Sequence, residues 1–222
     1  MIPKMGYLSR HPEKYPEKFR YEYDRHCIRL MKSRGRIRTT AYGIENLPKQ
    51  EGYVMFANHQ GKYDALGIMD THDEPCAVVV DYSWCHFPLV KQFVELVQGK
   101  WMKLDDIRQA ARIISEVTAE VKQGRRFIIF PSGGYKHRNG NYVDPFKPGS
   151  FKSAMKAKAP IVPVALIDSW KVFDLWSLRR VHTKVVYLEP LYYEEYKEMS
   201  SVEVCQMVYK RICKTIEEYL KK

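Results

Sequence analysis

The sequence contains no apolar run long enough to cross a membrane. Its longest apolar runs, at residues 127–130 and 161–167, are far shorter than the roughly 20 apolar residues that a membrane-spanning helix needs. The first thirty residues also lack the apolar centre of a secretory signal, and they carry seven Lys and Arg residues. We therefore expect a protein without a transmembrane helix that stays in the cytoplasm.

Cysteine is too sparse and too irregularly spaced to build a covalent or metal framework. The five cysteines are odd in number and none belongs to a Cys-x-x-Cys pair, which argues against a disulfide framework and against a zinc site. We expect reduced thiols and no bound metal. Internal repeats and flexible linkers are also missing, so the simplest organisation is one domain at residues 39–222 behind an N-terminal segment at residues 1–38.

Basic residues are in excess and are concentrated at the N-terminus. The chain has 37 Lys and Arg residues against 26 Asp and Glu, a net charge of +11, and this balance favours anionic partners. Residues 1–38 hold eleven basic and four acidic residues. Residues 16–33 have a helical period, with a stripe formed by Phe19, Tyr23, Cys27, Leu30 and Met31. The stripe would either pack on the core or anchor the protein peripherally on an anionic inner membrane face.

The remainder of the chain alternates between strand-like and helical patterns. Short apolar runs predict strands at residues 53–57, 76–80, 127–130, 161–167 and 184–188. Segments of helical period separate them. This alternation predicts an α/β domain with a central mixed sheet flanked by helices.

Two helices of this domain have clear start signals. Asp105 or Asp106 would cap the first, which ends near Gly124 and would bury Ile107, Ala110, Ile114, Val117 and Val121. The second opens with Ser200 and Glu203 in a capping box and would bury Val204, Val208, Ile212 and Ile216. Both stripes are interpreted as core.

The best candidates for chemistry are His59 and Asp64, which directly follow the expected strand at residues 53–57. In a regular helix they would point about 140° apart, so the two can meet only if the backbone bends between them, and Gly61 permits a bend. Asp64 would then orient the imidazole, whose other nitrogen takes a proton from an acceptor hydroxyl. A His–Asp pair without a catalytic role remains the alternative on spacing alone.

Four segments together resemble a known family. Asn58 and His59, followed after four residues by Asp64, resemble the His-x4-Asp motif of the glycerolipid acyltransferases, which include 1-acyl-glycerol-3-phosphate acyltransferase. Residues 130–133 resemble the family's Phe-Pro-Glu-Gly-Thr-Arg block, residues 146–151 its Phe-Lys-x-Gly stretch, and residues 161–164 its Val-Pro strand. These matches follow the family's order and span roughly residues 44–221, which makes a chance match much less probable than for the His–Asp spacing alone.

The resemblance implies an acyltransferase of phospholipid biosynthesis, with His59 as general base and Asp64 as its partner. The donor would be a thioester of coenzyme A or of acyl carrier protein, or an acyl phosphate, and it would serve as co-substrate without a further cofactor. The acceptor would be the hydroxyl of a lysophospholipid or a glycerol-phosphate-like lipid.

The sequence departs from the family at the block that begins with Phe130. Ser132, Gly134 and Tyr135 replace the family's Glu, Thr and Arg, so its usual acceptor-binding pair is missing. We predict that a phosphate is held instead by nearby cations, chiefly Lys103, Lys136 and Arg138, although each could equally be a solvated charge. Substrate contacts are also predicted for Asn58 and for the backbone amides of Gly133 and Gly134.

Two other functions are compatible with these features. The missing Glu and Arg favour a catalytically inactive protein of the same fold that binds membranes or lipids. The excess basic charge is also typical of nucleic-acid binders, but the sequence has no recognised nucleic-acid module, so we expect no nucleic-acid partner.

Overall fold

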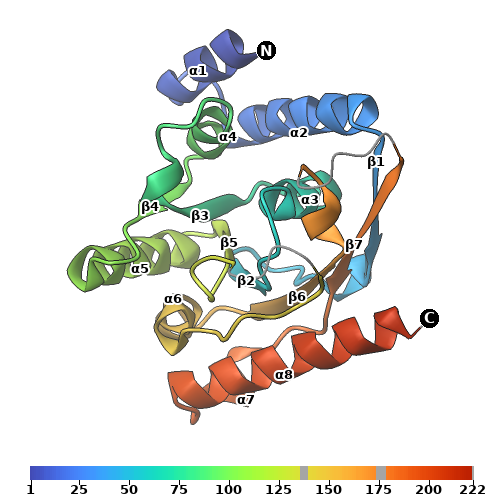
Figure 1. Ribbon diagram of the computed structural model, residues 1–222. Coiled ribbons are helices and arrows are strands. Elements are labelled where there is room, and N and C mark those ends of the chain that lie inside the picture. The colour runs from blue at the N-terminus through green and yellow to red at the C-terminus, as the bar shows by residue number, and fades with distance from the viewer. Residues whose placement is uncertain (136–139, 174–178, 222) are drawn as a thin grey trace.

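The computed structural model describes residues 1–135, 140–173 and 179–221, and within them seven strands form one mixed sheet (Figure 1). The strands lie in the order β1-β7-β6-β2-β5-β3-β4. Neighbours run parallel except β6 and β7, which are antiparallel. The strands are β1 Ile37–Tyr42, β2 Tyr53–Ala57, β3 Ala77–Asp81, β4 Lys100–Met102, β5 Arg126–Ile129, β6 Ile161–Ile167 and β7 Val181–Tyr187.

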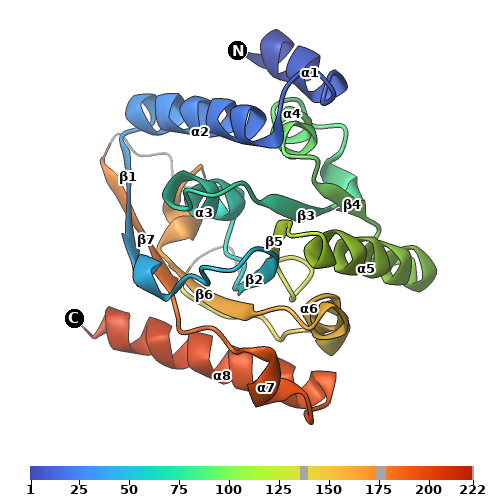
Figure 2. The ribbon, with the colours of Figure 1, turned by 180° about the vertical axis from the view of Figure 1, so that it is seen from behind.

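Helices cover both faces of the sheet, as Figures 1 and 2 show from opposite sides. One face carries α1 Ile2–Arg10, α2 Glu17–Arg34, α3 Asp64–Thr71 and α4 Val90–Leu96. The other face carries α5 Ile107–Lys122, α6 Lys152–Ala157, α7 Tyr193–Tyr196 and α8 Ser201–Leu220. The prediction of a mixed α/β sheet flanked by helices is therefore confirmed.

Alternation along the central strands divides the core into two layers. In β2, Tyr53 and Met55 belong to the layer under α1–α4, whereas Val54 and Phe56 belong to the layer under α5–α8. Successive side chains of a strand point to opposite faces, so a run that is apolar throughout supplies both layers. This explains why the central strands are continuous apolar runs.

The two capped helices begin where the sequence predicts. The Asp106 side chain accepts a hydrogen bond from the Gln109 amide at 2.9 Å, and Ser200 and Glu203 form the reciprocal box at the start of α8. The buried stripe of α8 is confirmed. The stripe of α5 is partly wrong, because Ile107 is 85% exposed while Ile113 and Thr118 are buried.

The buried face of α2 differs from the predicted stripe. Phe19 and Leu30 are exposed, and the face toward the core is formed by Arg20, Tyr21, Asp24, Arg25, Cys27 and Ile28. Arg20 donates to the carbonyl oxygen of Leu96 at 2.6 Å. Buried arginines with partners were read as solvated, which is why the hydrophobic pattern pointed to the wrong face.

The N-terminal segment is packed into the domain. Met5 and Leu8 of α1, together with Tyr21 and Ile28 of α2, join the same apolar layer as β2, and β1 adds an edge strand next to β7. Strands β1 and β4 were not predicted, since β1 is rich in polar residues and β4 has only three residues. In the described part of the chain, no helix is both long and apolar enough to span a bilayer.

Candidate active site

Four loops meet at one edge of the sheet and form the candidate site. Strands β2, β3, β4 and β5 are parallel to their neighbours, so the segments that follow their carboxyl ends emerge at the same edge. That edge is where open α/β sheets place reactive groups. The segment after β2 carries His59, and the segment after β5 carries residues 130–135.

His59 and Asp64 are in direct contact. The Nδ1 atom of His59 lies 2.6 Å from Oδ2 of Asp64. Residues 58–63 are not helical, and α3 begins at Asp64 itself. The predicted bend therefore exists, but Gly61 does not adopt a positive φ. Its contribution is its backbone amide, which donates to Asp64 Oδ2 at 2.9 Å.

Asp64 is a fully buried carboxylate that accepts four hydrogen bonds. Its Oδ2 accepts from the amides of Gln60 and Gly61 as well as from His59, and its Oδ1 accepts from the Ser169 hydroxyl. Several donors on one carboxylate favour its charged form. An acceptor-only carboxylate requires the proton of His59 to sit on Nδ1, which leaves Nε2 free to accept a proton.

Ser169 and Gln60 are functional-site residues that the sequence analysis missed. Ser169 opens the short helix η4 Ser169–Lys171 just after β6, the parallel neighbour of β2. The Oε1 atom of Gln60 accepts from the Ser169 amide at 3.1 Å, so the loops after β2 and β6 are tied together. A polar residue at the end of a strand parallel to β2 was the available signal.

Two aromatic rings hold the imidazole of His59. Phe130 stacks on it with ring centroids 4.3 Å apart, and Tyr135 meets it edge-on at 4.7 Å. Tyr135 stands where the acyltransferase block has its Arg. The ring of His59 is thus fixed by packing as well as by Asp64, while its side chain stays 21% exposed.

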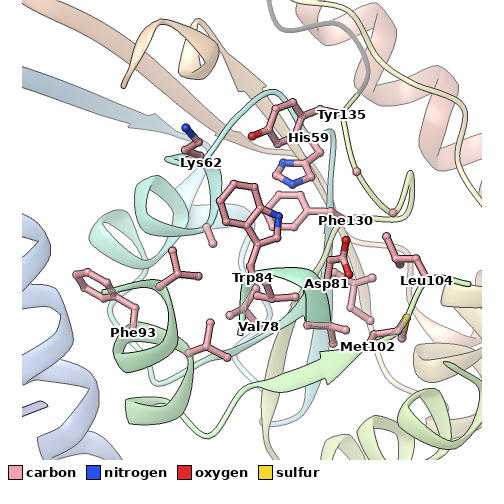
Figure 3. Close-up of a pocket in the computed structure, with 18 of the residues that line it drawn as sticks. His59, Lys62, Val78, Asp81, Trp84, Phe93, Met102, Leu104, Phe130 and Tyr135 are labelled. Atoms are coloured by element: carbon pink, nitrogen blue, oxygen red, sulfur yellow. The ribbon is translucent and has the colours of Figure 1, made fainter. Parts of the chain in front are cut away.

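His59 lines a cavity of about 670 Å³ whose wall is mainly apolar (Figure 3). The figure shows His59 and Tyr135 at one end, Phe93 and Met102 farther along, and Trp84 between them. Cavities of this size and character are typical of sites for small organic ligands. A proton acceptor therefore stands at the end of a largely apolar chamber.

Asn58 does not have the predicted contact with substrate. It is fully buried, and its amide group donates to the Leu166 carbonyl at 3.0 Å and accepts from the Leu166 amide at 2.8 Å. Both ends of the side chain are used to join β2 to β6. Asn58 fixes the position of the strand end from which His59 projects.

Gly133 and Gly134 do line the cavity, with φ values of 76° and 157° that favour glycine. The Gly133 amide donates to the Phe130 carbonyl at 3.0 Å, so it is not available to an incoming oxyanion. A Cβ atom at Gly134 would meet nothing within 4 Å. The Gly134 amide is thus the better candidate donor.

The cations near the cavity differ from those predicted. Lys103 lies with its ammonium 5.1 Å from the ring centroid of Tyr82, and it is not among the described residues that line the cavity. Lys136 and Arg138 lie outside the described residues. Lys62 and Lys147 line the cavity instead, and neither was singled out from the sequence as a binding residue.

Lys147 is held beside the glycine turn. Its backbone amide donates to the Pro131 carbonyl at 2.9 Å, and a Cβ atom built on Gly133 would lie 3.0 Å from its Nζ atom. The absence of a side chain at Gly133 therefore makes room for the ammonium group. Among the described residues, no group of three or more His, Cys, Asp or Glu side chains is arranged to hold a metal ion.

Comparison with known proteins places this geometry in a family. The family model described as "Acyltransferase" matches residues 38–167, more than half of the chain, and this region contains both His59 and Asp64. The 1-acyl-sn-glycerol-3-phosphate acyltransferase of Borreliella burgdorferi is 28% identical over 149 residues, covering 67% of this chain and 59% of the relative. The human 1-acyl-sn-glycerol-3-phosphate acyltransferase alpha is 29% identical over 145 residues, covering 65% of this chain and 50% of the relative.

A solved structure supports the same assignment at the level of the fold. The chain matches the crystal structure of the 1-acyl-sn-glycerophosphate acyltransferase PlsC from Thermotoga maritima with a TM-score of 0.80 and 21% identity, over 99% of this chain and 88% of that one. The match to the curated relatives spans only about half of their length. Since the family model covers most of the sheet and both members of the His–Asp pair, the chain belongs to the acyltransferase family.

Proposed function

We propose that the protein transfers an acyl group from an activated donor to the hydroxyl of a lysophospholipid or a glycerol-phosphate-like acceptor. The observation that carries this proposal is the contact of His59 with buried Asp64 at the end of a largely apolar cavity. The names of the curated relatives point to the same reaction. The donor is a thioester of coenzyme A or of acyl carrier protein, or an acyl phosphate.

The proposed reaction begins with the acceptor hydroxyl. His59 Nε2 takes its proton as the oxygen attacks the acyl carbonyl carbon, and the imidazolium is stabilised by Asp64. The tetrahedral intermediate collapses with cleavage of the bond to sulfur, or to phosphate oxygen. The proton passes from His59 to the leaving group, so the base is regenerated. The Gly134 amide is placed to donate to the oxyanion.

Lys147 and Lys62 supply positive charge for the phosphate of the acceptor. Both line the cavity that contains His59, and a lysine binds phosphate as a point charge. Asp81 is the acidic residue in the same wall, and its carboxylate accepts from the Ser83 amide at 3.0 Å. The family's missing Arg is thereby replaced by cations from other segments.

The test is acyl transfer by the purified chain, followed by release of the free thiol and by formation of the acylated product. His59→Ala should lower kcat by about 10²- to 10⁴-fold, and Asp64→Asn should also lower it because the imidazole loses its orienting carboxylate. A chelator should leave the rate unchanged, since no step uses a metal. Full activity of His59→Ala would exclude this mechanism.

A second candidate is an inactive lipid-binding protein of the same fold. It is favoured by Ser132, Gly134 and Tyr135, which replace the family's Glu, Thr and Arg. Assays with several donors and acceptors separate the two. Consumption of any donor that depends on His59 excludes the inactive alternative.

The N-terminal segment is proposed to contact an anionic membrane surface. The side chains of Phe19 and Leu30 are exposed on α2, and a basic residue near such a surface contributes about 1 kcal/mol. Deletion of residues 1–38 is not a clean test, because Met5 and Tyr21 belong to the core. Phe19→Asp should weaken flotation with anionic vesicles, whereas unchanged flotation would place the contact elsewhere.

A further inference from the structure

An exposed apolar patch lies at the mouth of the cavity. It consists of Tyr82, Phe87, Leu104 and Ile107, and we call these four residues the mouth patch. Tyr82 begins the short helix η2 Tyr82–Trp84 after β3, and Leu104 follows β4. Because β3 and β4 are parallel neighbours, their two following loops emerge at the edge that also carries His59.

The two loops of the mouth patch are in contact. Lys103 places its ammonium 5.1 Å from the ring centroid of Tyr82, a distance at which a cation is attracted to an aromatic face. The exposed fractions are 41% for Tyr82, 52% for Phe87, 38% for Leu104 and 85% for Ile107. Isolated exposed apolar residues are ordinary, but a group of four from two touching loops marks an interaction surface.

The mouth patch is continuous with the cavity. Leu104 is part of the patch and also lines the cavity. Trp84 lines the cavity as well, and its ring centroid is 4.8 Å from that of Phe87. Apolar surface therefore extends without interruption from the outside of the protein into the chamber that contains His59 (Figure 3).

Charge on this side of the molecule suits an anionic surface. Lys103 and Arg108 are exposed beside the patch, and of the neighbouring acids Asp105 is exposed while Asp106 caps α5 through the Gln109 amide. Helix α1 packs against α4, which follows Phe87 along the chain. The N-terminal segment, with eleven basic and four acidic residues, thus lies next to this side.

We infer that the mouth patch inserts into the surface of a bilayer that contains anionic lipid, so that a lipid substrate passes from the membrane directly into the cavity. This inference rests on the proposed function. Aromatic and aliphatic side chains beside cations are the composition that binds at the headgroup boundary. A lipid that enters there need not expose its acyl chain to water, because apolar groups line the whole route.

The experiment compares the full-length protein with Phe87→Asp, Ile107→Asp and the double variant. Neither residue lines the cavity among the described residues, and both are exposed, so the fold should be retained. Val202→Asp is the matched control, since Val202 is 48% exposed on α8, on the opposite face of the sheet. Flotation is measured with phosphatidylcholine vesicles with and without phosphatidylglycerol.

We expect each mouth-patch substitution to lower partitioning onto the anionic vesicles by about tenfold or more, because an inserted apolar side chain is replaced by a charge. Val202→Asp should float as the unmodified protein does. Acyl transfer to a short-chain, water-soluble acceptor should be unchanged in all variants, whereas transfer to an acceptor presented in vesicles should fall with flotation.

Flotation of the double variant equal to that of the unmodified protein would overturn the inference, as would a protein that floats with neither vesicle. A loss of activity only with acyl carrier protein as donor, at unchanged flotation, would assign the patch to a carrier protein and equally overturn it. Failure of the proposed function is distinct, because the unmodified protein would then transfer no acyl group even to the soluble acceptor.

Discussion

Ser169 and His59 bind different oxygens of the same buried carboxylate, Asp64. The hydroxyl of Ser169 donates to Oδ1, whereas Nδ1 of His59 lies 2.6 Å from Oδ2. The two residues are 110 positions apart in the sequence and arrive from the ends of neighbouring parallel strands, β6 and β2. Ser169 is thus a positioning residue, which acts on His59 through Asp64.

The first prediction concerns Ser169→Ala. Loss of a hydrogen bond to a charged group costs about 1.5–3 kcal/mol, and if part of this is felt in the transition state, kcat should fall by roughly tenfold. The KM of the acceptor should change little, and the pH profile of kcat should shift because the carboxylate beside His59 is less well stabilised. Ser169→Thr, which retains the hydroxyl, is the control. An unchanged pH profile in Ser169→Ala would reduce Ser169 to a structural residue.

The central part of the fold was accessible from the sequence. Strands β2 and β6 occupy the predicted residues because they are apolar throughout, and α8 has both a capping box and a regular stripe. The face of α2 was not accessible. Arg20 and Arg25 are buried because partners far along the chain accept their hydrogen bonds, for example Leu96 and Asp73, and a local pattern contains no information on such partners.

The candidate site was predictable in its centre and not at its edge. His59 and Asp64 lie five residues apart, so their contact depends only on the loop between them. Lys147 reaches the cavity because its amide binds Pro131 and because Gly133 has no side chain. That placement is a property of two segments together, which explains why Lys103 was selected and Lys147 was not.

The second prediction follows from Lys147. Lys147→Ala should raise the KM for an acceptor that carries a phosphate by about tenfold, since the charge-assisted contact is lost, and should leave the KM for a neutral acceptor unchanged. Lys152→Ala is the matched control, because Lys152 is exposed and is not among the described residues that line the cavity. An equal rise with both acceptors would show that Lys147 does not recognise phosphate.

The third prediction concerns acid stability and His72. The Tyr53 hydroxyl donates to Nε2 of His72 at 2.6 Å, and Nδ1 donates to the Glu74 carbonyl at 2.6 Å, so the buried ring is neutral. Burial lowers the pKa of His72 to about 4. Its contribution to stability is therefore present above the ordinary histidine pKa and is lost as the pH falls from about 6.5 toward 4.

Over that interval the free energy of unfolding should decrease by about 3 kcal/mol on account of His72. Urea unfolding between pH 4 and pH 8 measures the slope, and His72→Asn serves as the comparison because it cannot titrate. The variant is expected to be less stable at neutral pH and to have a flatter pH dependence. Parallel curves for the two proteins would contradict the prediction.

The last prediction concerns Asp24, the buried acid of α2. It is 0% exposed, and neither carboxylate oxygen has a hydrogen-bond partner among the described residues. Burial raises the pKa of Asp24 well above its ordinary value. The folded state therefore keeps the proton that the unfolded state releases, and stability falls as the pH rises above the ordinary aspartate pKa.

Asp24→Asn removes this titration with almost no change of shape. The variant should be more stable than the unmodified protein at pH 8, by at least about 1 kcal/mol given the cost of burying an unpaired polar group, and the difference should shrink toward pH 4. Asp73→Asn, at an exposed acid that pairs with Arg25, is the contrasting variant, because loss of its ion pair should not stabilise the protein. A gain at pH 8 that equals the gain at pH 4 would mean that Asp24 does not take up a proton on folding, and the stabilisation would then come from packing alone.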